Sequence, residues 1–338
     1  MKSRFYSLNR MIGVTAISMA VMQAYAAPTC STVGTSGSVA FTWAVASNFY
    51  EPALSLATAY ADSQNYQITV CHDSSGNLYN AIVPDNAPQY ALFFSADIER
   101  PADISLYYPA LVASGPYNYA HGIPTFLLSP AAYAATTGNY RAVNYLTTGL
   151  AAGLGASAES SDSSLPPINN YVALNRPRDE PSVDYLAIGD PKLAPYGVAA
   201  SWILGIDPTN YPNNMNLWNA ANVFDAGSNV TSSCSSLVSG TEWICTYSNI
   251  DYTLQAIAGD MATAGFVSYA QVCPVWADAK FQLDQYVLFP DYETTQAYVA
   301  LNVKDATAQA DATAFLASLG IGGTTWNTWL GNNCYKSL

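Results

Sequence analysis

The sequence contains few charged residues, and most of them are acidic. Only 10% of its 338 residues are Asp, Glu, Lys or Arg, and 11 Lys and Arg stand against 24 Asp and Glu, which gives a formal net charge of −13. Binding to nucleic acid needs a basic surface that so few cations cannot supply. We therefore exclude nucleic acid as a partner and expect a surface made largely of Ser, Thr, Asn and the 25 Tyr side chains.

Sequence signatures of catalysis and of metal binding are also scarce. The chain has two histidines, His72 and His121, and none of its six cysteines belongs to a C-x-x-C pair, so a zinc site has too few ligands. Ser75 lies close to His72 in the sequence, but no Gly-x-Ser-x-Gly turn accompanies it. We expect a binding protein rather than an enzyme, with no cofactor and no bound metal ion.

A membrane-spanning helix needs about 20 consecutive apolar residues, and the sequence has no such run. The apolar stretch 11–21 is too short to span a bilayer, and it follows a basic start formed by Lys2, Arg4 and Arg10. Ala24-Tyr25-Ala26 comes next and has the small-x-small pattern that signal peptidase requires. These features predict that residues 1–26 are a signal peptide, cleaved after Ala26, and that the protein is periplasmic or secreted.

An even number of cysteines in an exported chain favours disulfides over metal thiolates. We expect Cys234 and Cys245 to pair, because they enclose Ser239-Gly240 and would close a short β-hairpin. The other four cysteines allow several pairings. Two of them flank an early strand, and one in the C-terminal tail could reach the end of a late strand, so we favour the pairs Cys30–Cys71 and Cys273–Cys334.

Strand-like and helix-like segments alternate along most of the chain, which is typical of an α/β fold with parallel sheets. We expect strands at 38–45, 66–70, 90–94, 125–128, 185–188, 265–268, 286–289 and 298–303. Helices are expected at about 49–63, from 77, and at 196–204, 251–264 and 306–319. Residues 27–338 exceed what one hydrophobic core usually serves, so the pattern predicts two lobes. Residues 156–170 are expected to form a surface loop, and 207–249 an insertion that interrupts the alternation.

Two strand-to-helix junctions combine serine with a helix start: Ala46-Ser47-Asn48 and Asp73-Ser74-Ser75-Gly76. In a parallel sheet both junctions lie at the carboxyl edge, where ligands bind. A helix start offers unpaired N–H groups and a partial positive charge, so serine hydroxyls added there would form an anion site without Lys or Arg. Pro195-Tyr196-Gly197 opens a third such helix. The alternative is that the serines only cap their helices.

Five segments occur in an order that resembles the periplasmic molybdate-binding proteins of ABC transporters. They are Ala44-Val-Ala-Ser47, Ser74-Ser75-Gly76-Asn-Leu78, Phe93-Phe-Ser-Ala-Asp97, Leu186-Ala-Ile-Gly-Asp-Pro191 with Pro195-Tyr196-Gly197, and Ala264-Gly-Phe-Val-Ser268. The resemblance runs from about residue 39 to residue 319. It implies a two-lobed flytrap fold, each lobe a mainly parallel sheet flanked by helices. We expect lobe 1 at 27–122 and 285–338, and lobe 2 at 123–284.

The resemblance also implies a function and a set of ligand-binding residues. A monomeric protein of this family holds a tetrahedral oxyanion such as molybdate in the cleft between its lobes and delivers it to the permease of an ABC transporter. The family's anion-binding hydroxyls correspond to Ser47 and Ser75, its N–H donors to Tyr196 and Ile250, and its tyrosine hydroxyl to Ser268.

This chain departs from the family pattern on one side of the expected cleft. Ser268 replaces the tyrosine, Asp251 stands where the family often has arginine, and the 207–249 insertion directly precedes these positions. The ligand could therefore be a larger anionic metabolite or a metal chelate. The scaffold could also have left transport and serve as a surface antigen or adhesin.

Overall fold

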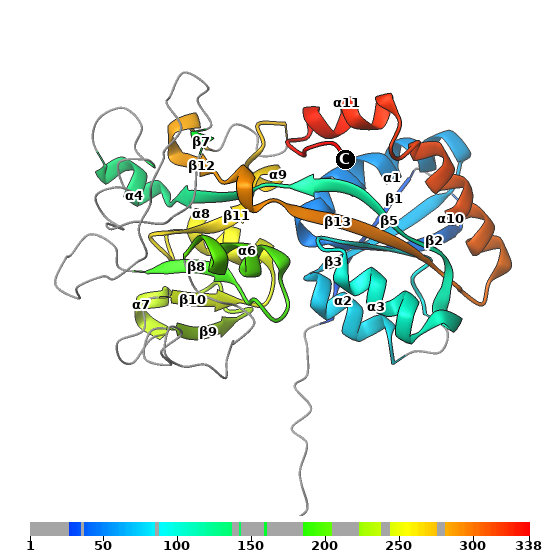
Figure 1. Cartoon of the computed structure of the whole chain (residues 1–338), viewed down its shortest axis with the longest axis horizontal. Coiled ribbons are helices and arrows are strands. Elements are labelled where there is room, and N and C mark those ends of the chain that lie inside the picture. The colour runs from blue at the N-terminus through cyan, green and yellow to red at the C-terminus, as the bar shows by residue number, and fades with distance from the viewer. Residues whose placement is uncertain are drawn as a thin grey trace, which may run out of the picture.

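The computed structural model describes residues 27–34, 37–84, 88–136, 142, 159–160, 185–204, 223–237, 244–275 and 281–338. The expected signal peptide, most of the 156–170 loop and much of the 207–249 insertion lie outside these ranges. The described residues form two lobes, each built on one mixed sheet flanked by helices (Figure 1). No helix among them is long and apolar enough to cross a membrane.

The first lobe contains a six-stranded sheet with the order β1-β3-β2-β4-β13-β5. Its strands are β1 (Thr29–Val33), β2 (Val39–Ala46), β3 (Gln67–Asp73), β4 (Leu92–Ser95), β5 (Val112–Gly122) and β13 (Thr294–Leu301). The neighbouring strands β3, β2 and β4 pair parallel, whereas β1, β13 and β5 pair antiparallel with their neighbours. The helices are α1 (Tyr50–Gln64), α2 (Ser75–Ile82), α3 (Glu99–Tyr107), α10 (Ala306–Leu319) and α11 (Thr324–Asn332).

Aromatic side chains fill the core of this lobe. Alternation along β2 directs Phe41, Trp43 and Val45 to the same face of the sheet, and all three are buried there. The ring of Trp43 meets Phe94 and Phe315 edge to face, with centroid distances of 4.9 and 5.1 Å. This packing fixes the position of β2, and therefore of the residues at its carboxyl end.

The second lobe contains a seven-stranded sheet with the order β7-β12-β6-β11-β8-β10-β9. Its strands are β6 (Pro124–Leu128), β7 (Glu159–Ser160), β8 (Leu186–Gly189), β9 (Val223–Gly227), β10 (Ile244–Tyr247), β11 (Ala264–Ser268) and β12 (Tyr286–Leu288). The strands β11, β8, β10 and β9 are parallel, whereas β6, β12 and β7 pair antiparallel. The helices are α4 (Pro130–Ala135), α6 (Pro195–Ile203), α7 (Cys234–Leu237), α8 (Ile250–Ala258) and α9 (Tyr269–Val272). The two-lobed α/β fold is as expected, but the sheets are mixed rather than mainly parallel.

Within the described residues, the chain crosses between the lobes twice. It first passes from β5 in one sheet to β6 in the other between Gly122 and Pro124, and it returns between β12 and β13, over residues 289–293 (Figure 1). Because β12 belongs to the second sheet, residues 285–288 are part of the second lobe. The expected boundary at 285 was therefore a few residues too early.

Three disulfides join the cysteine pairs favoured from the sequence: Cys30–Cys71, Cys234–Cys245 and Cys273–Cys334. The first links directly paired residues of β1 and β3. The second does not close a hairpin as expected, because β9 and β10 are parallel and the short helix α7 carries Cys234 between them. The third joins the end of α9 in lobe 2 to the tail after α11 in lobe 1, so it ties the two lobes together beside the strand crossings.

Candidate ligand site between the lobes

On lobe 1, Ser47 and Ser75 occupy neighbouring strand ends, and neither hydroxyl caps a helix. Ser47 follows β2 and opens the 3-10 turn Ser47–Phe49, which has no side-chain cap. Ser74 is the residue that caps α2, because its Oγ accepts a hydrogen bond of 3.1 Å from the N–H of Asn77. Ser75 Oγ instead accepts a 2.9 Å bond from the N–H of Ala96, so its own hydrogen remains available for donation.

Ser47 and Ser75 are both nearly inaccessible to solvent in this closed arrangement. The hydroxyl of Ser47 has one weak contact, 3.5 Å to Nδ1 of His72. The capping interpretation therefore fits Ser74 and does not fit either of the two serines expected to bind the ligand.

Lobe 2 presents two helix starts to the same region. α6 begins at Pro195 after β8, and its N-cap residue Ala194 has no side chain that could bond to the first turn. α8 begins at Ile250 after β10, and its N-cap residue Asn249 accepts a 2.9 Å bond from the N–H of Tyr252. The N–H groups of Tyr196 and Ile250 occupy first-turn positions, which have no acceptor within their own helix.

The two lobes meet through these residues. Ala46, Ala96, Tyr196 and Ile250 form one buried cluster, the first two from lobe 1 and the last two from lobe 2. Ala46 precedes Ser47 in the chain, and Ala96 is bonded to Ser75, so the structure brings Ser47, Ser75, Tyr196 and Ile250 together. We refer to these four residues as the inner cluster.

Ser268 lies behind the inner cluster. Its hydroxyl donates a 2.9 Å hydrogen bond to the hydroxyl of Tyr196 and also caps α9, in a capping box with Gln271. The Tyr196 hydroxyl accepts a further 3.0 Å bond from Nε2 of Gln296 on β13, and burial raises the pKa of Tyr196 to about 12. The Ser268 hydroxyl is thus occupied by the protein itself and supports Tyr196 from behind.

Gly122, at the first crossing, leaves space for this arrangement. A Cβ atom on residue 122 would overlap the hydroxyl of Tyr196 and the amide of Gln296. Tyr196 of lobe 2 therefore packs against lobe 1 at a position where the strand carries no side chain.

Two acidic residues and a histidine lie beside the inner cluster, and no pattern in the sequence groups them. His72 Nδ1 is 2.9 Å from Oδ2 of Asp251, so this ion pair joins β3 of lobe 1 to α8 of lobe 2. Asp251 also accepts a 2.7 Å bond from Nε2 of Gln271, and the His72 ring stacks on Tyr50. The extra carboxylate expected at position 251 is present, but it is paired.

Asp73 is the second of these acidic residues. Its Oδ1 accepts bonds from the N–H of Ser74 at 2.6 Å, from Nδ2 of Asn77 at 3.0 Å and from Nδ2 of Asn249 at 3.2 Å. The carboxylate therefore bridges the starts of α2 and α8, one from each lobe. Burial raises the pKa of Asp73, and the three hydrogen bonds partly offset that effect.

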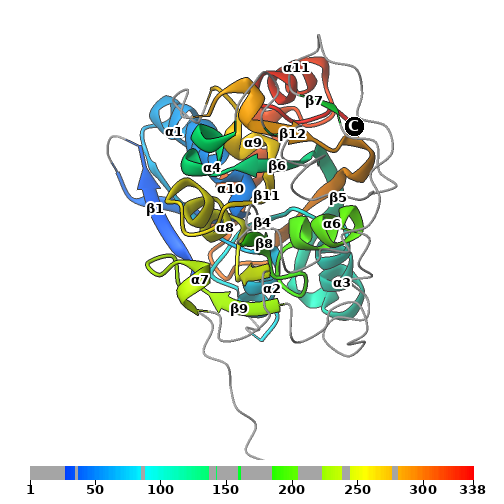
Figure 2. The ribbon, with the colours of Figure 1, turned by 90° about the vertical axis from the view of Figure 1, so that its left-hand side faces the viewer.

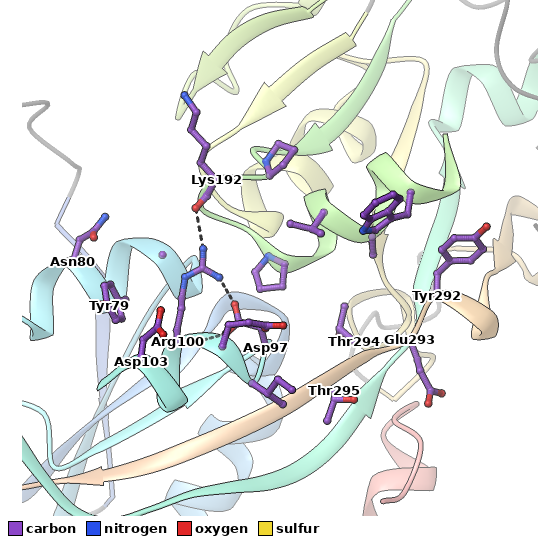
Figure 3. Close-up of a pocket in the computed structure, with 18 of the residues that line it drawn as sticks. Tyr79, Asn80, Asp97, Arg100, Asp103, Lys192, Tyr292, Glu293, Thr294 and Thr295 are labelled. Carbon is purple, nitrogen blue, oxygen red and sulfur yellow. Dashed lines mark hydrogen bonds and ion pairs between the residues drawn. The ribbon is translucent and has the colours of Figure 1, made fainter. Parts of the chain in front are cut away.

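Direct bonds between the lobes close the cleft next to Ser75. The N–H of Gly76 donates to the carbonyl of Leu193 at 2.9 Å, and Nη2 of Arg100 donates to the carbonyl of Lys192 at 2.8 Å. Arg100 also forms an ion pair with Asp97 on its other side (Figure 3).

A cavity of about 860 Å³ opens on the far side of these bonds, between the lobes. We refer to it as the outer cavity. Its walls come from α2, α3, α6 and residues 291–295, and both charge signs are present, with Arg100 and Lys192 beside several carboxylates (Figure 3). Tyr79, Trp202 and Tyr292 supply aromatic surface. No residue of the inner cluster lines it, although Gly76 and Pro195, their neighbours in the chain, do.

Metal binding finds no support in the described part of the chain, where no three His, Cys, Asp or Glu side chains are placed to hold an ion. The view along the long axis of the molecule shows the second lobe, with α8 and β8 near its centre and α6 to one side, in front of the first lobe (Figure 2). Helix starts and strand ends of the two lobes, rather than clustered ligating side chains, thus make up the interlobe contact.

Comparisons with known proteins agree with this architecture. The family model of bacterial extracellular solute-binding proteins matches residues 41–320. The solved periplasmic molybdate-binding protein of Azotobacter vinelandii is similar with a TM-score of 0.55 and 19% identity, over 87% of this chain and 98% of that one. No curated protein matches the sequence.

Two further solved structures share the fold at lower identity. A substrate-binding protein of an ABC transporter from Agrobacterium tumefaciens has a TM-score of 0.52 and 11% identity, over 90% of this chain and 82% of that one. A periplasmic binding protein from Actinobacillus pleuropneumoniae, solved with fructose-6-phosphate, has a TM-score of 0.50 and 10% identity, over 89% and 84%. At these identities the similarity shows the fold and not the ligand.

Proposed function

Because the chain belongs to the family of bacterial extracellular solute-binding proteins, we propose that it captures a small tetrahedral oxyanion at the inner cluster and delivers it to an ABC transporter. The observation that carries this proposal is the juxtaposition of two buried serine hydroxyls that cap no helix, on lobe 1, with two helix starts of lobe 2. Molybdate belongs to this ligand class, and the similar protein of Azotobacter vinelandii is a molybdate-binding protein. The protein acts as a monomer in the periplasm, with a transporter permease as its partner.

The energetics explain why several donors are needed when no cation is present. Moving an ion from water into a medium of low dielectric constant costs about 20 kcal/mol in the Born limit, and more for a dianion. Hydrogen bonds to a charged group return about 1.5–3 kcal/mol each, so roughly seven well-aimed donors are required. The hydroxyls of Ser47 and Ser75, together with the N–H groups of Tyr196 and Ile250 at the starts of α6 and α8, are donors of this kind, and the helix dipoles add to them.

Substitution of the two serines tests the proposal. Ser47→Ala and Ser75→Ala should each weaken oxyanion binding by about 1.5–3 kcal/mol, which is roughly ten- to a hundredfold. Calorimetric titration with molybdate, tungstate, sulfate and phosphate measures the change. Ser63→Ala, at an exposed position near the end of α1, is the matched control and should bind as the wild type does.

The melting temperature without ligand should barely change in Ser47→Ala, because this hydroxyl caps no helix. It should fall in Ser75→Ala, because the buried N–H of Ala96 loses its acceptor, which costs about 1–3 kcal/mol. Wild-type affinity in both Ser47→Ala and Ser75→Ala would place the ligand elsewhere. A failure of all four anions to bind the wild-type protein would refute the oxyanion class itself.

A larger anion is the second candidate, and the outer cavity favours it. Its volume of about 860 Å³ lies in the range of sites for drug-sized ligands, and Arg100 and Lys192 line it. If an organic phosphate binds there, Arg100→Ala should lose more affinity than Ser75→Ala. Titration of both variants with the same phosphate ester distinguishes the two candidates.

A further inference from the structure

Asp73 places a buried carboxylate beside a site proposed to hold an anion. Its side chain lies between the starts of α2 and α8, through bonds to the N–H of Ser74 and to the amide of Asn249. The residue is only 4% exposed. A carboxylate at this position already uses donors that an anionic ligand would otherwise engage, and it repels any ligand oxygen that cannot offer a hydrogen.

Two buried amide oxygens of lobe 1 also lack a hydrogen-bond donor within the described part of the chain. Asn48 Oδ1 and Asn77 Oδ1 have no hydrogen-bond partner among the described residues. The residues are 2% and 5% exposed. Asn48 directly follows Ser47, and the amide nitrogen of Asn77 is bonded to Asp73. Buried acceptors of this kind are normally paired, so they indicate a ligand that donates hydrogen bonds as well as accepting them.

Neighbouring charges do not remove the acceptor character of Asp73. His72, the residue before it in the chain, is paired with Asp251, and Arg100 is paired with Asp97. Asp73 itself is bonded to neutral groups, namely one backbone N–H and two asparagine amides. The site therefore combines hydroxyl and N–H donors on the serine side with carboxylate and amide acceptors on the asparagine side.

We propose that Asp73 sets the selectivity of the site, so that it prefers oxyanions carrying a hydroxyl or a proton, such as hydrogen phosphate, over acceptor-only anions such as sulfate and molybdate. This inference rests on the proposed oxyanion function and specifies its ligand class. The protonated oxygen of the ligand donates to Asp73, and its remaining oxygens accept from Ser47, Ser75 and the helix starts. An anion without a proton leaves a ligand oxygen against the carboxylate.

Hydrogen phosphate and sulfate form the sharpest pair of probes, because they are similar in size and charge and differ in one proton. Calorimetric titration of the full-length mature protein at mildly alkaline pH should show hydrogen phosphate binding at least about tenfold more tightly than sulfate. Asp73→Asn should reduce that ratio by tenfold or more, because an amide can donate to an unprotonated oxygen. Asp62→Asn, which removes one negative charge from an exposed position on α1, should leave the ratio unchanged.

The possible results separate this inference from the function on which it rests. If sulfate or molybdate binds the wild-type protein more tightly than hydrogen phosphate does, the selectivity is refuted and the oxyanion function stands. An unchanged ratio in a folded Asp73→Asn protein would also refute the role of Asp73. If no oxyanion binds, the proposed function fails first. The wild-type ratio decides the question even where Asp73→Asn does not fold.

Discussion

The inner cluster and the outer cavity lie on two sides of the same interlobe contact, yet they differ in almost every property. The inner cluster is buried, contains hydroxyls and helix starts, and has no cationic side chain. The outer cavity is open and carries Arg100, Lys192 and several carboxylates along its wall (Figure 3). The bond from the N–H of Gly76 to the carbonyl of Leu193 lies between them.

The difference indicates how a protein with few cations could hold an anion. Fixed neutral donors impose a geometry and a hydrogen-bonding pattern, and they are strongest where water is excluded. Mobile charged side chains at an open rim attract ions at a distance, but solvent and salt screen them. We therefore assign affinity and selectivity to the inner cluster and expect the outer cavity to contribute mainly to the approach of the ligand.

Loss of lobe closure should have the largest effect. A Cβ on residue 76 would lie 2.8 Å from Cα of Leu193, so Gly76→Ala should hold the lobes apart and remove the lobe 2 donors from the ligand. We expect oxyanion binding to weaken by about 3 kcal/mol, roughly a hundredfold. The matched control is Gly331→Ala, because no atom lies within 4 Å of its added Cβ. Near-wild-type affinity of Gly76→Ala in calorimetry would show that binding does not need this contact.

Removal of the positive charge from the outer cavity should have a smaller effect. Arg100→Ala deletes the bond to the carbonyl of Lys192 and a partly buried ion pair with Asp97, neither of which involves a residue of the inner cluster. Oxyanion affinity should fall by no more than about fivefold, mostly through a slower association rate at low salt. Lys304→Ala, at an exposed position outside the cavity, controls for net charge. A loss greater than tenfold in stopped-flow or calorimetric titration would move the binding site to the outer cavity.

The smallest effect should appear in ligand-free stability as a function of pH. Burial raises the pKa of Asp73 above its ordinary value of 3.8. The folded state therefore binds the carboxyl proton of Asp73 more tightly than the unfolded state does. The free energy of unfolding falls as pH rises from 3.8 through the folded-state pKa.

Asp73→Asn has no carboxyl group at this position and does not lose stability in this way. Its melting temperature should therefore rise relative to the wild type as pH increases from 3.8 through the folded-state pKa of Asp73. Thermal melts at a series of pH values measure the difference. A constant difference across the whole series would show that Asp73 titrates normally in the folded protein.

Local sequence patterns predicted the two-lobed α/β fold and many of its strands and helices. Alternation along β2 and the serine after it placed Ser47 at the carboxyl edge of the sheet, and the same reasoning placed Ser75 beside it. Strand pairing was harder to predict, because it depends on segments far apart in the chain. No local pattern in the sequence indicates that β1 and β13 pair antiparallel or that β9 and β10 pair parallel. For that reason we predicted neither mixed sheets nor a disulfide outside a hairpin.

The missed polar residues of the site have a related explanation. We expected this strand to end at residue 70, but β3 continues to Asp73 because it pairs with β1 on one side and with β2 on the other. The bonds from Asp73 to Asn249 and from His72 to Asp251 cross between the lobes, and no spacing within the sequence reports them. An acidic residue directly before the Ser-Ser-Gly turn was the one available signal.

A crystal structure of the protein with arsenate or molybdate, whichever binds more tightly, tests the central claim most directly. Both anions scatter anomalously, so the position of the bound ion is unambiguous. We predict one anomalous peak within hydrogen-bonding distance of the hydroxyls of Ser47 and Ser75 and of the N–H groups of Tyr196 and Ile250. A peak in the outer cavity beside Arg100 and Lys192, with the inner cluster unchanged, would contradict the account.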